Sequence, residues 1–189
     1  MESNQIIIFA SGSGSNAENL ITYFSKKSYK INWIIYTNNQ KAGVINRANK
    51  LKVKYRIFDK NELYNGNVLT SINIINPKLI ILAGFLLKFP KDIVNFYYKK
   101  IINIHPALLP KYGGKGMYGM NVHNAIIRNK ETVSGITIHY INSNYDEGPI
   151  IFQKKVKIDS LDSPIDLANK IHVLEMKFFP KIIEEIIIK

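Results

Sequence analysis

The chain has no cysteine among its 189 residues, and this absence removes several kinds of chemistry. It excludes a disulfide framework, a thiolate nucleophile and a cysteine metal site. No apolar run reaches the ~18 residues that a membrane-spanning helix needs. Residues 1–4 carry no cationic leader, so we expect no signal peptide. Together these absences favour a cytoplasmic protein that does not bind membranes.

Acidic residues are also scarce, with 14 Asp and Glu against 26 Lys and Arg, which gives a formal net charge of +12. The basic residues are scattered singly or in pairs and form no block, so small anionic substrates are favoured over nucleic acid. Hydrophobic residues make up 46% of the chain, a proportion typical of globular proteins. Length and composition fit one domain spanning residues 1–189.

Short apolar runs alternate with helical patterns over the first two thirds of the chain. This alternation predicts an α/β fold with a doubly wound, mostly parallel, Rossmann-like sheet. Two longer, alternating strands near the end predict added edge strands, and Ser163 and Pro164 predict the cap and first residue of a C-terminal helix. The expected strands are 5–10, 30–37, 53–58, 79–83, 101–104, 133–140 and 150–156; the expected helices are 17–26, 42–51, 61–76, 91–98, 122–129 and 163–187.

One strand, the run from Ile101 to Ile104, ends in polar residues. Asn103 and His105 are two residues apart, so in an extended chain their side chains point to the same face. An amide donor beside an imidazole suits polar catalysis near neutral pH. Pro106 and Pro110 restrict the chain that follows. The alternative is a strand end whose polar side chains only satisfy nearby backbone groups.

A glycine-rich loop follows the first strand, and its sequence Gly12-Ser-Gly14-Ser-Asn-Ala17 matches the dinucleotide pattern G-x-G-x-x-G/A. The second strand, however, ends in residues 36–39 without the acidic residue that an NAD site needs. No Walker motif occurs. Backbone N–H groups at the start of a helix suit a single phosphate, which makes a phosphate monoester the favoured ligand. The alternative is a helix cap made by Ser15 or Asn16.

Asp146 lies between the last two strands and is a candidate partner for His105. A nearby carboxylate raises the pKa of an imidazole and holds its orientation. Asp146 could also be an ordinary turn residue. His139 is expected to face the same pocket, whereas His123 and His172 fall in helices, where surface or capping roles are expected. These histidine spacings match no metal-ligand motif, so we predict no metal.

An apolar loop, residues 84–89, follows the fourth strand. Such a loop is an ordinary lid over the core, or it clasps a flat aromatic ring.

Taken together, these segments resemble the phosphoribosylglycinamide formyltransferase family over essentially the whole chain. The Asn-x-His-Pro segment and the later Asp are shared by formyl-transferring enzymes, so they specify the reaction better than the acceptor. The glycine-rich loop is similar to the loop with which this family binds a ribose phosphate. The segments that carry the resemblance are 11–16, 83–85, 103–110 and 146–149.

The resemblance implies transfer of a formyl group from the co-substrate 10-formyltetrahydrofolate to the amine of 5′-phosphoribosylglycinamide, in de novo purine (IMP) biosynthesis. It implies small-molecule partners only, a monomer or homodimer, and no metal. The residues it implies are Asn103, His105 and Asp146 for catalysis; Gly14, Ser15 and Asn16 for the substrate phosphate; Glu175 for the ribonucleotide; and Leu86, Leu87, Lys88, Phe89 and Asn103 for folate.

Three alternative functions remain open at this point. A methionyl-tRNA formyltransferase-like enzyme shares the catalytic core, and a formyltetrahydrofolate deformylase would release formate without an acceptor. A non-enzymatic nucleotide-binding module would need only the glycine-rich loop and would leave Asn103, His105 and Asp146 without a role.

Overall fold

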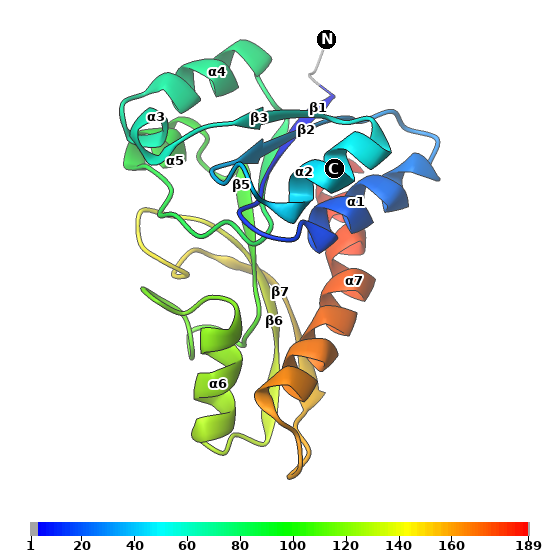
Figure 1. Cartoon of the computed structure of the whole chain (residues 1–189), viewed down its shortest axis with the longest axis vertical. Helices are drawn as coiled ribbons and strands as arrows, with labels where there is room; N and C mark the ends of the chain where they lie inside the picture. Colours follow the sequence, from blue (N-terminus) through cyan, green and yellow to red (C-terminus); the bar gives the residue numbers. More distant parts are fainter. Residues whose placement is uncertain (1–3, 189) are drawn as a thin grey trace. The chain divides into compact units, whose positions relative to one another are not determined.

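The computed structural model describes residues 4–188 and confirms an α/β fold with a mostly parallel sheet. The chain divides into two compact units, the first ending at Ile102 and the second beginning at Asn103. The boundary falls inside strand β5 (Ile101–His105), so this strand belongs to both units. Figure 1 shows the elements coloured along the sequence.

The first unit is a parallel sheet with strand order β3-β2-β1-β4-β5. Strand β1 pairs in parallel with both β2 and β4, and β3 pairs in parallel with β2. Besides β5, the elements of the first unit are β1 Gln5–Phe9, α1 Ser15–Ser25, β2 Asn32–Thr37, α2 Gly43–Leu51, β3 Lys54–Ile57, α3 Lys60–Tyr64, α4 Asn67–Ile75, β4 Leu79–Leu82 and α5 Lys91–Phe96.

Strand β1 is at the centre of the core of the first unit. Residues Ile6 to Phe9 expose at most 1% of their surface, on both faces of the strand. A strand buried on both faces has no polar alternation, which is why this segment is a continuous apolar run. Helices α1 and α2 are neighbours and lie side by side in Figure 1. The Phe9 ring packs against Tyr36, Phe58, Phe85 and Phe89.

The prediction of one helix over residues 61–76 is wrong, because this segment forms two helices, α3 and α4. Gly66 lies between them in the left-handed region, at φ 93°, where residues with a Cβ are disfavoured. Helix α3 starts with a capping box, in which Asp59 accepts from the Glu62 backbone and Glu62 accepts from the Asp59 backbone. The left-handed Gly66 and the Asp59 cap therefore divide this segment into two helices, although its apolar pattern is that of one continuous helix.

The second unit contains the end of β5, α6 Met120–Arg128, β6 Val133–Tyr140, β7 Ile150–Lys157 and α7 Pro164–Ile188. Strand order is β5-β6-β7 with β6 and β7 antiparallel, so the two added strands predicted near the end of the sequence lie at one edge of the sheet. Ser163 accepts from the Asp166 backbone at 3.2 Å, so the predicted cap of α7 is confirmed. Helix α7 continues past Pro180 and runs alongside β6 and β7 (Figure 1). Within residues 4–188, no helix is both long and apolar enough to cross a membrane.

The Asp59 cap gives a stability prediction. Asp59→Ala removes the acceptor for the Glu62 N–H and should lower the free energy of unfolding by about 1 kcal/mol. Asn61→Ala is the matched control, because Asn61 lies two residues after Asp59 in the first turn of α3, is exposed and is not the cap residue. Urea denaturation of the three proteins measures the difference. Equal unfolding midpoints for Asp59→Ala and the parent would contradict a stabilising capping box.

Candidate active site

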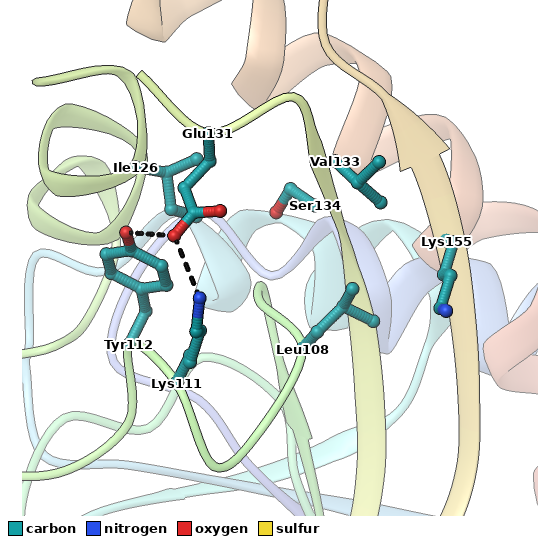
Figure 2. Close-up of a pocket in the computed structure, with 8 residues that line it drawn as sticks. All are labelled: Leu108, Lys111, Tyr112, Ile126, Glu131, Val133, Ser134 and Lys155. Atoms are coloured by element: carbon teal, nitrogen blue, oxygen red, sulfur yellow. Dashed lines mark hydrogen bonds and ion pairs between the residues drawn. The ribbon is translucent and has the colours of Figure 1, made fainter. Parts of the chain in front are cut away.

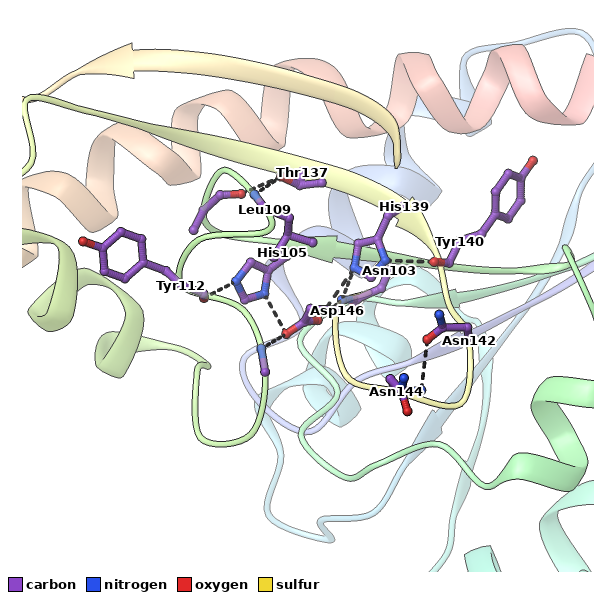
Figure 3. Close-up of polar contacts among 12 residues, drawn as sticks. Asn103, His105, Leu109, Tyr112, Thr137, His139, Tyr140, Asn142, Asn144 and Asp146 are labelled. Atoms are coloured by element: carbon purple, nitrogen blue, oxygen red, sulfur yellow. Dashed lines mark hydrogen bonds and ion pairs between the residues drawn. The ribbon is translucent and has the colours of Figure 1, made fainter. Parts of the chain in front are cut away.

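The Asp146 carboxylate joins the polar residues of the second unit, as Figure 3 shows. Its Oδ2 accepts from the Gly114 backbone at 2.9 Å and lies 3.7 Å from Nδ1 of His105. Its Oδ1 lies 3.7 Å from Nε2 of His139 and 3.5 Å from the amide nitrogen of Asn103. The side chains of Asp146, His105 and His139 expose 12%, 4% and 0% of their surface. The structure therefore brings Asn103, His105 and Asp146 together, with His139 as a fourth member.

The orientation of His105 follows from its two neighbours. Asn103 and His105 lie two residues apart on β5, as the sequence predicted. Nε2 of His105 lies 2.8 Å from the carbonyl oxygen of Tyr112, which can only accept, so Nε2 carries a hydrogen. Nδ1 then faces Asp146. The ring is held from both sides, and the side chain exposes only 4% of its surface.

The backbone around this cluster has unusual conformations. Tyr112 and Asp146 have positive φ values of 57° and 55°, which are uncommon for residues with a side chain. A Cβ added at Gly113 would lie 2.6 Å from Cδ2 of Leu109 and 3.1 Å from Cβ of Asp146. A larger residue would require the Leu109 side chain to move, so glycine allows the loop to lie close to Asp146, next to the Gly114 hydrogen bond.

His139 is neutral and fixes the orientation of Asn103. Its Nδ1 donates to the carbonyl oxygen of Tyr140 at 2.9 Å, so in the neutral ring Nε2 is an acceptor. The amide nitrogen of Asn103 donates to this atom at 3.1 Å. Burial lowers the pKa of His139, although the Tyr140 carbonyl and the Asp146 carboxylate both act to raise it. The flipped amide would place an oxygen against two acceptors, so the nitrogen faces His139 and Asp146.

The turn after His105 is held by side chains from β6 and β7. Thr137 donates to the carbonyl oxygen of Ala107 at 2.7 Å and accepts from the backbone N–H of Leu109 at 3.0 Å. Gln153 donates to the carbonyl oxygen of Leu109 at 3.0 Å and to Thr137 at 2.9 Å. The sequence did not mark Gln153 as a functional residue. A polar residue in an alternating strand is ordinary, so no sequence signal marked it.

The prediction of a surface or capping role for His123 is wrong. Its ring lies on α6 and exposes 6% of its surface, and Nδ1 has no hydrogen-bond partner among residues 4–188. Burial lowers the pKa of His123, while the charge of Glu175 raises it. Glu175, on α7, lies 3.6 Å from Nδ1 of His172, whose side chain is half exposed. Glu175, the residue predicted to contact the substrate, is therefore close enough to the buried His123 for its charge to raise the pKa of that histidine.

The glycine-rich loop of the first unit leads directly into α1. Gly14 is the N-cap at φ 77°, and a Cβ there would lie 2.4 Å from Cγ2 of Val44. Gly14 occupies the N-cap position of α1, so neither Ser15 nor Asn16 is its cap residue. These two residues instead form the first turn of the helix, whose N–H groups point out of its end.

The apolar loop after β4 is joined to this glycine-rich loop within the first unit. Ser11 donates its backbone N–H to the carbonyl oxygen of Gly84 at 3.0 Å, and its hydroxyl accepts from the Leu86 backbone at 3.1 Å. Leu86 is 46% exposed, whereas Phe89 is 6% exposed and packs on Phe9. Leu87 and Lys88 are intermediate. Phe89 therefore belongs to the core, and Leu86 presents the open apolar surface.

Because His123 and His139 are buried, we expect the protein to lose stability in acid. Their pKa values are lowered in the folded protein, from an ordinary value of about 6.5 in the unfolded chain. The unfolded chain therefore binds more protons, and the free energy of unfolding falls as pH drops below about 6.5 toward the lowered pKa values. Each histidine contributes at most about 1.4 kcal/mol per pH unit. Urea unfolding midpoints at pH 7.5, 6.5 and 5.5 measure this slope.

His139→Gln keeps a donor and an acceptor but does not titrate, so its stability should fall less steeply over the same pH range. His172→Gln is the control, because His172 lies half exposed on α7. A slope unchanged by His139→Gln would show that His139 binds its proton over the same pH range in the folded and the unfolded chain, so that burial does not lower its pKa.

Comparison with known proteins identifies the family. A family model described as formyl transferase matches residues 4–183. Phosphoribosylglycinamide formyltransferase of Bacillus subtilis is 30% identical over 95% of this chain and 93% of its own. The chloroplastic phosphoribosylglycinamide formyltransferase of Arabidopsis thaliana is 31% identical over 95% of this chain, which spans 64% of that longer protein.

A solved structure supports the same assignment. Phosphoribosylglycinamide formyltransferase from Anaplasma phagocytophilum matches with a TM-score of 0.85 and 30% identity, over 95% of this chain and 84% of that one. The fold is therefore the Rossmann-like formyltransferase fold. Because the family model covers nearly every residue, the chain belongs to the formyl transferase family and is a formyltransferase enzyme.

Proposed function

We propose that this enzyme transfers the formyl group of 10-formyltetrahydrofolate to the amine of 5′-phosphoribosylglycinamide, a step of de novo purine biosynthesis. The observation that carries this proposal is the cluster of Asn103, His105 and Asp146. Asn103 and His105 lie at the end of β5, and Asp146 comes from the loop between β6 and β7, about 40 residues later, with a carboxylate that is 12% exposed. The similarity to phosphoribosylglycinamide formyltransferases over 95% of the chain supports the choice of acceptor.

The reaction requires a charge to be stabilised and a proton to be moved. The acceptor amine attacks the formyl carbon, a C–N bond forms, and the carbonyl electron pair moves to oxygen. Collapse of this tetrahedral intermediate breaks the bond between the carbon and N10 of the folate. The amine loses one proton and N10 gains one, so the reaction balances without a metal or an added base.

Asn103 is the proposed donor to the oxyanion. One N–H of its amide is held by His139 at 3.1 Å, and the other makes a long contact of 3.5 Å to Asp146. A hydrogen bond of 3.5 Å is weak, so an oxyanion can take its place at little cost. His139 meanwhile keeps the amide in the donating orientation, which is the preorganisation that oxyanion stabilisation needs.

His105 and Asp146 are the proposed pair for charge and proton transfer. Nε2 of His105 is held by Tyr112, so only Nδ1 can exchange a proton, and it faces the carboxylate. In this arrangement Asp146 receives the amine proton and passes it to N10 as the bond between the carbon and N10 breaks, while His105 as imidazolium stabilises the developing negative charge. The carboxylate also keeps the imidazolium oriented.

The remaining predicted contacts are proposals for the two substrates. The first-turn N–H groups of α1 support a phosphate role for Gly14, Ser15 and Asn16, since a helix N-terminus favours an anion. Glu175 is proposed to contact the ribonucleotide, and Leu86, Leu87, Lys88 and Phe89, with Asn103, are proposed to hold the folate. The partners are small molecules and not nucleic acid, and we expect a cytoplasmic monomer or homodimer.

An acceptor assay tests the function. Purified protein mixed with 10-formyltetrahydrofolate should change the folate absorbance only when glycinamide ribonucleotide is added. Methionyl-tRNA and buffer alone are the control acceptors. Turnover with methionyl-tRNA would favour the tRNA-dependent enzyme, and formate release without any acceptor would identify a deformylase.

Substitutions in the cluster test the mechanism. Asn103→Ala and His105→Ala should each lower kcat by about 10²–10³-fold, the usual effect of losing one oxyanion donor. Asn49→Ala is the control, because Asn49 is an exposed residue of α2. Thermal melting checks that each variant is folded. Near-normal turnover in a folded Asn103→Ala or His105→Ala protein would refute the assigned roles.

A further inference from the structure

A cavity of the first unit borders the glycine-rich loop. Its volume is about 590 Å³. Its lining includes one residue of the loop and residues of α1 and α2, namely Ser13, Glu18, Arg47 and Lys50. A cavity of the second unit is smaller, about 290 Å³, and its carboxylate, on Glu131, is already paired with Lys111 and Tyr112 (Figure 2). The cavity of the first unit, in contrast, contains an arginine that contacts a loop proposed to bind a substrate.

Helix α2 holds two carbonyl groups of the glycine-rich loop. The carbonyl oxygen of Gly12 accepts from the backbone N–H of Val44 at 3.1 Å. The carbonyl oxygen of Ser13 accepts from Nε of Arg47 at 2.8 Å. Two successive carbonyl groups of the loop therefore face α2. The Val44 donor is a backbone group, so only the orientation of the Ser13 carbonyl depends on a side chain.

The direction of two backbone N–H groups follows from these carbonyl groups. In a trans peptide the C=O and N–H bonds lie in one plane and point in opposite directions, and both peptides are trans. Because the carbonyl groups of Gly12 and Ser13 face α2, the N–H groups of Ser13 and Gly14 point away from it. Neither N–H has an acceptor within residues 4–188. They add to the N–H groups at the start of α1, where the phosphate is proposed to bind.

Arg47 also neutralises a carboxylate near the loop. Its Nη1 pairs with Glu18, which lies in the first turn of α1. The two side chains expose 34% and 33% of their surface, and an ion pair this exposed adds little to stability. An unpaired Glu18 would, however, repel a phosphate at the same helix end. Arg47 therefore has two possible effects on phosphate binding, one through the Ser13 carbonyl and one through charge.

We propose that Arg47 is a positioning residue for the substrate phosphate and acts through the Ser13 carbonyl. Its Nε keeps this carbonyl on the α2 side, so that the N–H of Gly14 points to a phosphate oxygen. Nε and Nη1 are occupied by Ser13 and Glu18, so Arg47 acts through the loop and not by contact with the substrate. This inference rests on the proposed phosphate role of the glycine-rich loop.

Isothermal titration calorimetry with 5′-phosphoribosylglycinamide tests the proposal. Arg47→Met keeps the apolar part of the side chain and removes its donors, so it should weaken binding about tenfold. Lys50→Met is the matched control, because it removes the same charge from the same helix and cavity lining, and Lys50 is exposed. It should leave the affinity unchanged. Equal affinity of Arg47→Met and the parent, or equal losses in the two variants, would overturn the proposal.

Arg47→Gln separates the hydrogen bond from the charge. The amide nitrogen of glutamine is as many bonds from Cα as Nε of arginine, so it can donate to the Ser13 carbonyl without a positive charge. Glu18 loses its partner in both Arg47→Gln and Arg47→Met. Arg47→Gln should therefore bind the ribonucleotide within about threefold of the parent. If it binds as weakly as Arg47→Met, the effect belongs to charge and the positioning role is wrong.

A ligand without the phosphate separates positioning from general damage to the site. Glycinamide riboside, measured as a competitor of the ribonucleotide, should have the same inhibition constant in Arg47→Met and the parent. In the formyl-transfer assay, Arg47→Met should raise KM for the ribonucleotide about tenfold and leave kcat unchanged. An equal loss for the ribonucleotide and the riboside would contradict a role at the phosphate. Thermal melting checks that each variant is folded.

Binding and turnover together distinguish this inference from the proposed function. If the parent binds the ribonucleotide without formylating it, the function fails and the comparison of the Arg47 variants still decides the positioning role. If the parent formylates the ribonucleotide and Arg47→Met binds it equally well, the function stands and the positioning role fails. A parent that does not bind the ribonucleotide would overturn both.

Discussion

The buried Asp146 carboxylate is the constraint on which the second unit's polar cluster depends. It accepts hydrogen bonds from the Gly114 backbone and Asn103, and faces both His105 and His139. A carboxylate that is 12% exposed is stable only when its oxygens have partners of this kind, because an unpaired buried charge is strongly destabilising. The positive φ of Asp146 and the close approach of Gly113 to its Cβ accompany these contacts at the point where two loops reach the same carboxylate.

The neutral state of His139 follows from the same contacts and explains why Asn103 has a single orientation. If His139 were protonated, both of its nitrogens would donate, and the amide nitrogen of Asn103 would face the N–H at Nε2 instead of an acceptor. Burial lowers the pKa of His139 enough to keep Nε2 an acceptor near neutral pH. The hydrogen bonds then run in one direction, from Asn103 to His139 and from His139 to Tyr140. A fixed donor is what oxyanion stabilisation requires, so a buried histidine that contacts no reacting atom contributes to the proposed mechanism by positioning.

Much of this structure could be predicted from the sequence because the relevant patterns are local. The period of two in β5 placed Asn103 and His105 on one face, and apolar runs marked the buried strands such as β1. The division of residues 61–76 into two helices was missed, since it depends on a left-handed Gly66 and the Asp59 cap, which compete with a continuous helical pattern. His123 was misplaced because a histidine in a helix gives no signal of its burial, which here depends on packing between α6 and α7.

Long-range contacts show the limit of sequence reasoning most clearly in residues 106–114. Three anchors hold this segment: Thr137 and Gln153 at Leu109, Glu131 and Asn129 at Tyr112, and Asp146 at Gly114. None of these partners is within ten residues of its contact, so no local pattern reveals them. Of these three positions, Tyr112 bonds directly to His105. Asn103 is held separately by His139. The imidazole and the amide are therefore positioned by different contacts, so the proposed charge-stabilising residue is held independently of the proposed oxyanion donor.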